Sequence, residues 1–295
     1  MADPGRVVGT TRLTSAPGQT VPGSGGYAGQ QPIRLSAPPT PADTLRVLVL
    51  GDSVMGDASF GITAALQSTG EVAVATRTID GFGLEAAANW RTSIPNLIAQ
   101  SRAQLVVATW SWDQRGPTTP NALYQPVQYT RLLESAVATM LAPGNGVEGV
   151  IFTQFPQSGL VQSGSPSARA ADAQQRWRGV EAWNEIAERM TQLFPGRVMY
   201  FPVASSLMLH GKFSAWLPPE SDPGAPASEW IRVRKLDNVH LCPEGSARYA
   251  DALLFDMTAV FGLAPATADW SQGPWTTDPD FNDPPGACPD DHPPG

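Results

Sequence analysis

The chain has 295 residues and a hydrophobic fraction of 42%, which suits a globular protein of one large domain or two small ones. Its formal net charge is −8 and it has no basic stripe that could follow phosphate backbones, so we expect no nucleic-acid partner. No apolar run approaches the ~20 residues needed to cross a bilayer, and the first residues lack the apolar stretch of a secretory signal, so any export segment is expected to lie outside this chain.

The two ends of the chain differ in composition from its middle. Residues 1–43 are rich in Gly, Pro, Ser, Thr and Ala, and such a segment cannot offset its ordering entropy by burial. We therefore predict a Pro/Gly-rich linker or N-terminal arm there, followed by one domain over residues 44–265. Residues 266–295 are predicted to form an acidic, Pro-rich tail, whose Trp270, Trp275 and Phe281 could dock on the domain.

Within the domain, short apolar runs alternate with segments of helical period. Strands buried on both faces are continuously apolar and rich in β-branched residues, and runs of this kind occupy 45–50, 72–77, 104–109, 148–153 and 197–201. The helical period is clear in 127–141, 168–194 and 244–261, and Trp177 and Trp183 are expected in the core on one face of the second of these. The alternation predicts an α/β fold with a parallel sheet and right-handed crossovers.

Residues 202–236 interrupt this rhythm with a long, proline-rich stretch that contains Trp216 and Trp230. Irregular stretches of such length are usually functional or disordered. Its position just before His240 favours a lid or substrate loop, and a surface excursion without a role is the alternative.

The most informative motif is Gly51-Asp52-Ser53-Val54, which directly follows the first predicted strand. That position places a hydroxyl at the carboxyl edge of the sheet, where open α/β sheets bind ligands. Turns also use these residue types freely, so the motif needs a base for the serine before it indicates catalysis.

A base is offered by His240, because it follows the last predicted strand and precedes a helix. Histidine titrates near neutral pH, and Asp237 three residues earlier could hold its Nδ1–H in the manner of a catalytic triad. A helix N-terminal cap beside an unrelated histidine would also explain this spacing. The Gly-Asp-Ser motif at the other end of the domain favours the triad.

Together these residues resemble the SGNH (GDSL-type) hydrolase superfamily, in a first block Val49-Leu50-Gly51-Asp52-Ser53-Val54 and a last block running from Asp237 to Gly245. The resemblance implies a three-layer α/β/α sandwich with a flavodoxin-like, parallel five-stranded sheet. It also implies that Ser53 is the nucleophile, His240 the base and Asp237 the third member of the triad.

The resemblance further implies an oxyanion hole built from the backbone N–H of Ser53 and of a glycine after the second strand. Gly81 and Gly83 are the candidates, and Gly83 is preferred because Gly83-Leu84, before a helix that we expect to end near Trp90, is more similar to the second block of the family. An ordinary turn that uses glycine for its positive φ explains at least one of the two.

The third block departs from the family pattern, since Trp112 occupies the position of a usual asparagine in Trp110-Ser111-Trp112-Asp113. A side-chain amide that would stabilise the oxyanion is therefore missing, and the Ser111 hydroxyl or an indole N–H could replace it. Related losses occur in SGNH domains that modify bacterial envelope polysaccharides, often as acyltransferases.

Aromatic side chains are frequent near these motifs, and tryptophan faces stack on sugar rings as readily as they pack in cores. About half of the set Phe82, Trp90, Trp110, Trp112, Trp216 and Trp230 is expected in the core. The residues predicted to contact substrate are Trp110, Ser111, Trp112, Asp113 and Trp216.

The two cysteines, Cys242 and Cys288, are predicted to form a disulfide that holds the tail beside the active site; two unrelated free thiols are the alternative. A disulfide would indicate an oxidising, extracytoplasmic compartment. No metal or organic cofactor is expected, because no His, Cys or carboxylate cluster has ligand spacing.

These features predict a serine esterase or O-acyltransferase that acts on an acylated cell-envelope glycan or a small ester. The protein is expected to act as a monomer, alone or with a membrane-embedded acyltransferase partner or domain. The alternative is a catalytically weakened SGNH domain that serves as a carbohydrate-binding or scaffolding module, as the loss at Trp112 would suggest.

Overall fold

The computed structural model describes residues 29–85, 89–110, 122–159 and 166–293, the side chains of 166–173 excepted. Its centre is a five-stranded parallel sheet in the order β2-β1-β3-β4-β5. The strands are β1 (Leu45–Gly51), β2 (Val72–Thr78), β3 (Leu105–Thr109), β4 (Gly149–Thr153) and β5 (Val198–Phe201). Each lies within one residue of its predicted bounds at either end, because the continuous apolar runs mark strands buried on both faces.

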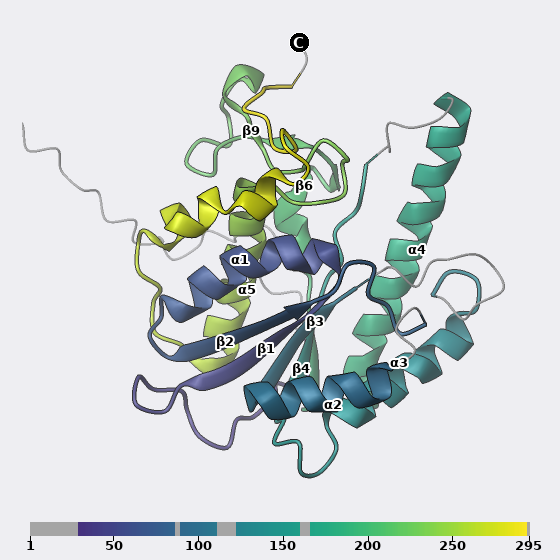
Figure 1. Ribbon diagram of the computed structural model, residues 1–295, viewed down its shortest axis with the longest axis vertical. Coiled ribbons are helices and arrows are strands. Elements are labelled where there is room, and N and C mark those ends of the chain that lie inside the picture. Colours follow the sequence, from purple (N-terminus) through teal and green to yellow (C-terminus); the bar gives the residue numbers. More distant parts are fainter. Residues whose placement is uncertain (1–28, 86–88, 111–121, 160–165, 294–295) are drawn as a thin grey trace, which may run out of the picture.

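Helices cover both faces of the sheet (Figure 1). They are α1 (Ser53–Gln67), α2 (Trp90–Ser101), α3 (Pro126–Met140), α4 (Pro166–Leu193) and α5 (Pro243–Phe261). Helices α1 and α5 pack together on one face, and α2, α3 and α4 lie on the other. The predicted three-layer α/β/α fold is therefore confirmed. The expectation of a helix that ends near Trp90 is wrong, since α2 begins at this residue.

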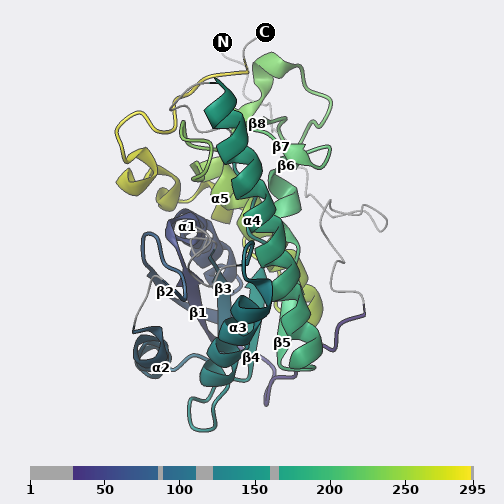
Figure 2. The same ribbon diagram turned by 90° about the vertical axis from the view of Figure 1, so that its right-hand side faces the viewer.

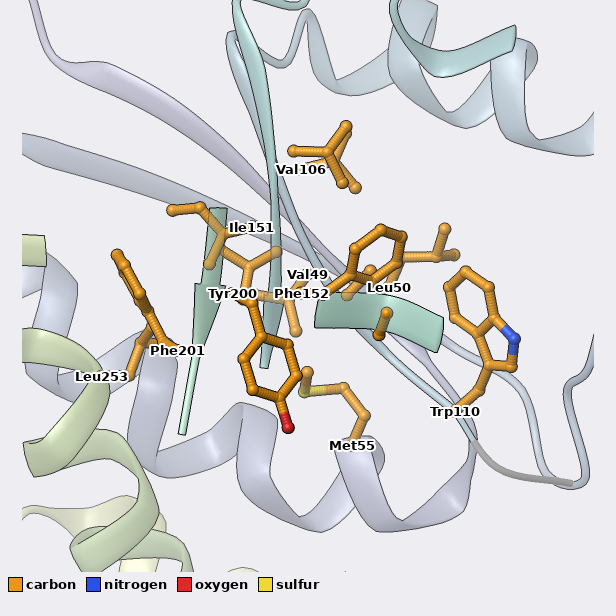
Figure 3. Packing of buried hydrophobic residues seen from close by; sticks show 14 of the residues in the cluster. Val49, Leu50, Met55, Val106, Trp110, Ile151, Phe152, Tyr200, Phe201 and Leu253 are labelled. Atoms are coloured by element: carbon orange, nitrogen blue, oxygen red, sulfur yellow. The ribbon is translucent and has the colours of Figure 1, made fainter. Parts of the chain in front are cut away.

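The core lies between the sheet and the two helical layers, and Figure 3 shows part of it. Trp183 on α4 is only 1% exposed, as predicted, whereas Trp177 on the same helix is 46% exposed, so its predicted core position is wrong. The 28 residues of α4 span ~42 Å, far more than the short strands beside it. Its amino-terminal half consequently extends past the sheet, as Figure 2 shows.

The described part of the N-terminal arm contacts the sheet layer. The Gln30 side-chain amide pairs with both the N–H and the carbonyl of Tyr200 at 2.9 Å. Ile33 is buried against Gly149, where an added Cβ would lie only 2.5 Å from its side chain. Residues 29–33 are thus ordered by specific contacts with β4 and β5.

The stretch 202–236 and the C-terminal tail add short elements at the carboxyl side of the sheet. They are η1 (Val203–Leu207), β6 (Met208–Leu209), β7 (Lys212–Phe213), β8 (Trp216–Leu217), η2 (Ala227–Glu229), β9 (Ile231–Arg232), η3 (Trp270–Gln272), η4 (Pro274–Thr277) and η5 (Pro279–Asn282). Strands β6 and β7 pair antiparallel, as do β8 and β9. In the part of the chain that the structure describes, no helix has the length and apolar character required to span a membrane.

Candidate active site

The turn from β1 into α1 is dictated by Gly51 and Asp52. A Cβ on Gly51 would lie 2.2 Å from the Thr109 carbonyl oxygen and 2.5 Å from the Met55 Cβ, so only glycine fits between β3 and α1. Asp52 is the N-cap of α1, and its Oδ1 accepts from the N–H groups of Val54 at 3.0 Å and Met55 at 3.4 Å. Ser53 is therefore the first residue of α1, at the carboxyl edge of the sheet.

The structure brings Ser53, His240 and Asp237 together. Nε2 of His240 lies 2.8 Å from Oγ of Ser53, and its Nδ1 lies 2.5 Å from Oδ2 of Asp237. The other carboxylate oxygen of Asp237 accepts from the N–H groups of Val239 and His240 at 2.9 and 3.0 Å. Asp237 does not cap α5, which begins at Pro243 with Cys242 at its N-cap. Asp237 thus orients the imidazole of His240 and does not cap a helix.

Three residues that the motif analysis overlooked hold the histidine loop in place. Oδ2 of Asp57 accepts from the Leu241 N–H at 2.9 Å, and the Lys235 N–H donates to the His240 carbonyl at 2.8 Å. The buried Arg234 guanidinium donates to the Val239 carbonyl at 2.9 Å. A signal existed for Asp57, because it lies one helical turn after Ser53 on an otherwise uncharged helix.

Asp57 and Lys235 also form an ion pair beneath the loop. Nζ of Lys235 lies 3.1 Å from Oδ1 of Asp57 and donates to the Asp280 carbonyl at 2.9 Å. Burial raises the pKa of the Asp57 carboxyl, and the nearby Lys235 ammonium opposes this shift. The pair therefore links the helix of Ser53, the loop of His240 and the C-terminal tail.

The surroundings of Asp237 and His240 favour the charged form of each side chain. Burial acts to raise the pKa of Asp237, but hydrogen bonds from the His240 side chain and from the N–H groups of Val239 and His240 outweigh it and lower the pKa to about 2. Burial acts to lower the pKa of His240, but its hydrogen bond to Asp237 and the charges of Asp237 and Asp57 raise it above the ordinary histidine value.

The two glycines proposed for the oxyanion hole follow β2. Gly81 has φ +67° in a turn closed by the Phe82 N–H to the Ile79 carbonyl at 2.9 Å, and this third turn position favours glycine. A turn role therefore accounts for Gly81. Gly83 is buried two residues further on. Ser111, Trp112 and Asp113 lie outside the described residues.

Trp110 and Trp216, which the sequence predicted to contact substrate, make other contacts in this structure. Trp110, which is labelled in Figure 3, is 0% exposed. Its Nε1 donates to the Tyr129 hydroxyl at 3.0 Å. Trp216 stacks under the Arg232 guanidinium at 4.2 Å and donates from Nε1 to Oδ1 of Asp291 at 3.0 Å. Trp110 is thus a core residue, and Trp216 joins the 202–236 stretch to the tail.

The predicted disulfide between Cys242 and Cys288 is confirmed. It attaches the tail two residues after His240, and two further contacts reinforce the attachment. Arg232 binds Asp291 through two hydrogen bonds of 2.5 and 2.6 Å, and the Leu236 N–H donates to the Ala287 carbonyl at 2.8 Å. The tail is therefore fixed beside the loop that carries His240.

A cleft of about 870 Å³ opens onto Ser53 and His240. One side of it is formed by α1 and the end of β2, and the other by Pro274, Trp275, Asp280, Asp283 and Pro284 of the tail. Figure 1 shows this tail segment, in yellow, running above α1. Sequence reasoning predicted that the tail docks, but not that it forms a wall of the cleft.

A comparison of the sequence with protein-family models and with curated proteins finds no match. Solved structures resemble it, including Est24, a carbohydrate acetylesterase from Sinorhizobium meliloti, with a TM-score of 0.50, 15% identity, and coverage of 74% of this chain and 100% of that chain. The native aryl esterase of M. smegmatis matches with a TM-score of 0.47, 13% identity, and coverage of 74% and 100%. A variant of Axe2, an acetyl-xylooligosaccharide esterase from a Geobacillus species, matches with a TM-score of 0.45 and 16% identity. The match covers 75% of this chain and 95% of that chain. The chain thus shares its overall fold with Est24.

Proposed function

We propose that this protein is a serine carboxylic-ester hydrolase or O-acyltransferase with Ser53 as nucleophile. The observation that carries the proposal is the contact chain from Ser53 Oγ through both nitrogens of His240 to Asp237, with distances of 2.8 and 2.5 Å. A hydroxyl bonded to an imidazole that a carboxylate orients is the arrangement that activates serine for acyl transfer.

In the first step, Oγ of Ser53 attacks the ester carbonyl while Nε2 of His240 takes the hydroxyl proton. The carboxylate of Asp237 holds Nδ1–H and stabilises the imidazolium, and it stays ionised because its pKa is about 2. The tetrahedral intermediate then collapses, the bond to the leaving alcohol breaks, and His240 returns the proton to that alcohol. An acyl group remains on Ser53.

We propose that the oxyanion of this intermediate is bound by the backbone N–H groups of Ser53 and Gly83. Ser53 begins α1. The first N–H groups of a helix have no partner within the helix and lie at the positive end of its dipole, where they can bind an anion. The Ser111 hydroxyl or an indole N–H would complete this site in place of the asparagine that is usual in SGNH hydrolases.

In the second step, His240 removes a proton from water or from a sugar hydroxyl, and this oxygen attacks the acyl carbonyl. The bond between the acyl group and Oγ of Ser53 then breaks, and His240 returns the proton to Oγ. If water receives the acyl group, the protein is an esterase, and if a sugar hydroxyl receives it, the protein is an O-acyltransferase. An acylated glycan as donor or acceptor agrees with the carbohydrate acetylesterase activity of Est24. The disulfide supports an extracytoplasmic setting, and we propose the cell envelope as that setting.

The proposal is tested by turnover of p-nitrophenyl acetate and of acetylated glycans by the wild type and the Ser53→Ala variant. We expect turnover in the wild type and a loss of at least ~10³-fold in the variant, since removal of the nucleophile leaves only binding and the oxyanion hole. Equal turnover by the two proteins would contradict the triad assignment.

The second candidate, a glycan-binding SGNH module without catalysis, is favoured by Trp112 alone. It predicts glycan binding with the same affinity by the wild type and Ser53→Ala, and no covalent reaction of Ser53. Labelling of Ser53 by a fluorophosphonate would exclude it.

A further inference from the structure

The cleft beside Ser53 follows one face of α1 for most of the length of the helix. The α1 residues that line it recur at the three- and four-residue spacing of one broad helix face: Ser53, Gly56, Asp57, Ser59, Phe60, Thr63, Ala64 and Gln67. Gln67 lies 14 positions after Ser53 in the helix, which corresponds to ~21 Å along its axis. The cleft is thus much longer than a small acyl group, and its outer part is available to the non-reacting portion of a substrate.

The tail wall of this cleft is held rigidly against α1. Trp275 stacks on Trp270 with ring centroids 6.4 Å apart and an interplanar angle of 11°, and its Nε1 donates to the Trp270 carbonyl at 2.8 Å. The buried Phe281 ring lies 5.0 Å from Phe60 on α1 and 6.0 Å from Trp275. Trp275 therefore faces the cleft in a fixed orientation.

Negatively charged side chains outnumber positively charged ones along the cleft. Among the described residues that line it, five are aspartates and one, Lys235, is a lysine or arginine. Lys235 is already paired with Asp57, and Asp237 is paired with His240. The remaining three, Asp80, Asp280 and Asp283, are exposed, and no ion pair joins them to any part of the chain that the structure describes.

These carboxylates stand at both sides of the outer cleft. Asp80 follows β2, and Asp280 and Asp283 belong to the tail wall. A cleft lined by one sign of charge concentrates ligands of opposite sign and repels ligands of the same sign, an effect that salt screens over ~8 Å at physiological ionic strength. The uncharged lining residues Thr63, Gln67, Thr76 and Thr78 offer hydrogen bonds to hydroxyl groups without adding charge.

We propose that the cleft between α1 and the C-terminal tail binds the non-reacting portion of an uncharged or cationic ester, and that Asp80, Asp280 and Asp283 discriminate against esters that carry carboxylate, sulfate or phosphate groups. The inference rests on the proposed function, because it assigns the cleft to the substrate of Ser53. It adds that esters of neutral or cationic alcohols are substrates in preference to esters of anionic alcohols.

The test uses three aryl acetates that differ only in one substituent of the leaving group: trimethylammonium, methyl or sulfonate. Each kcat/KM is divided by the rate constant of the same ester in alkaline solution, which removes differences in intrinsic reactivity. We expect the cationic ester to exceed the anionic one about tenfold or more at low salt, and this ratio to shrink as salt is added.

The triple variant Asp80→Asn, Asp280→Asn and Asp283→Asn should bring this ratio close to one. Asp269→Asn is the matched control, because it removes an exposed carboxylate of the tail that does not line the cleft, and it should keep the wild-type ratio. Equal rates for the cationic and anionic esters in the wild type, or an unchanged ratio in the triple variant, would overturn the inference.

A failure of the inference can be told apart from a failure of the proposed function. The binding of the three aryl groups, as the corresponding phenols, is measured by calorimetry on Ser53→Ala. The phenols could differ in affinity according to their charge while ester turnover is absent or does not depend on Ser53. This result would overturn the proposed function and support the assignment of the cleft as a binding site. Ser53-dependent turnover without discrimination would overturn only the cleft assignment.

Discussion

At the residue scale, the proposed triad of Ser53, His240 and Asp237 predicts how activity depends on pH. His240 must be neutral to act as a base, and its pKa is raised above the ordinary ~6.5. Activity should therefore rise with pH through a midpoint above that value. The protonated form is the one stabilised by folding, so its contribution to stability is present below pH ~6.5 and is lost as pH rises through the folded pKa.

Asp237→Asn should lower both the rate and this midpoint. The substitution removes the hydrogen-bonded negative charge that raises the pKa of His240, and it also favours the wrong imidazole tautomer. We expect kcat to fall ~10⁴-fold and the midpoint of kcat/KM against pH to move to lower pH. An unchanged midpoint would show that another group controls the profile. Asp269→Asn serves as the control that loses an equal charge elsewhere.

The ion pair between Asp57 and Lys235 gives a second prediction at the level of single residues, which concerns stability. Their side chains are only 9% and 7% exposed, so removal of one charge leaves the other buried without its partner. Lys235→Met should lower the free energy of unfolding by ~3–5 kcal/mol, measured by denaturant titration. The double variant Asp57→Asn with Lys235→Met should lose less than the sum of the two single variants, and strict additivity would contradict the coupling.

At the element scale, the disulfide and the tail act as one unit. The bond between Cys242 and Cys288 closes a loop with a sequence separation of 46, and the entropy of such a loop corresponds to about 4 kcal/mol. This loop contains α5 and the described tail wall. The disulfide therefore stabilises both the helix after His240 and the outer side of the cleft.

Cys242→Ala with Cys288→Ala should lower the free energy of unfolding by ~2–4 kcal/mol. Reduced wild type provides the matched control and should show the same loss, whereas the variant should not respond to reductant. Wild type that keeps its full stability under verified reduction would show that the remaining contacts, such as Arg232 with Asp291, are sufficient to hold the tail.

The sequence predicted the elements well where the signal was local. Apolar runs located all five strands of the sheet, and the Gly51-Asp52-Ser53 motif located the turn at its carboxyl edge. Periodicity showed which face of α4 is apolar but not how far the helix extends past the sheet, and this is why the position of Trp177 was wrong.

At the scale of the whole molecule, what the sequence could not predict depends on contacts between distant segments. The burial of Trp110 among Phe82, Phe152 and Trp183 follows from packing of four separate segments. The cleft likewise requires the tail to lie over α1, more than 200 residues earlier in the chain. The sequence predicted a disulfide that holds the tail beside the active site and aromatic residues that could dock, but no pattern placed the tail over α1.

The measurement that tests the central claim most directly is covalent labelling of the native protein by a fluorophosphonate, read by intact mass and peptide mapping. The account predicts a single adduct on Ser53, absent from Ser53→Ala, with a labelling rate that rises with pH through the same midpoint as turnover. A native protein that remains unlabelled, or an adduct that forms equally in Ser53→Ala, would contradict it.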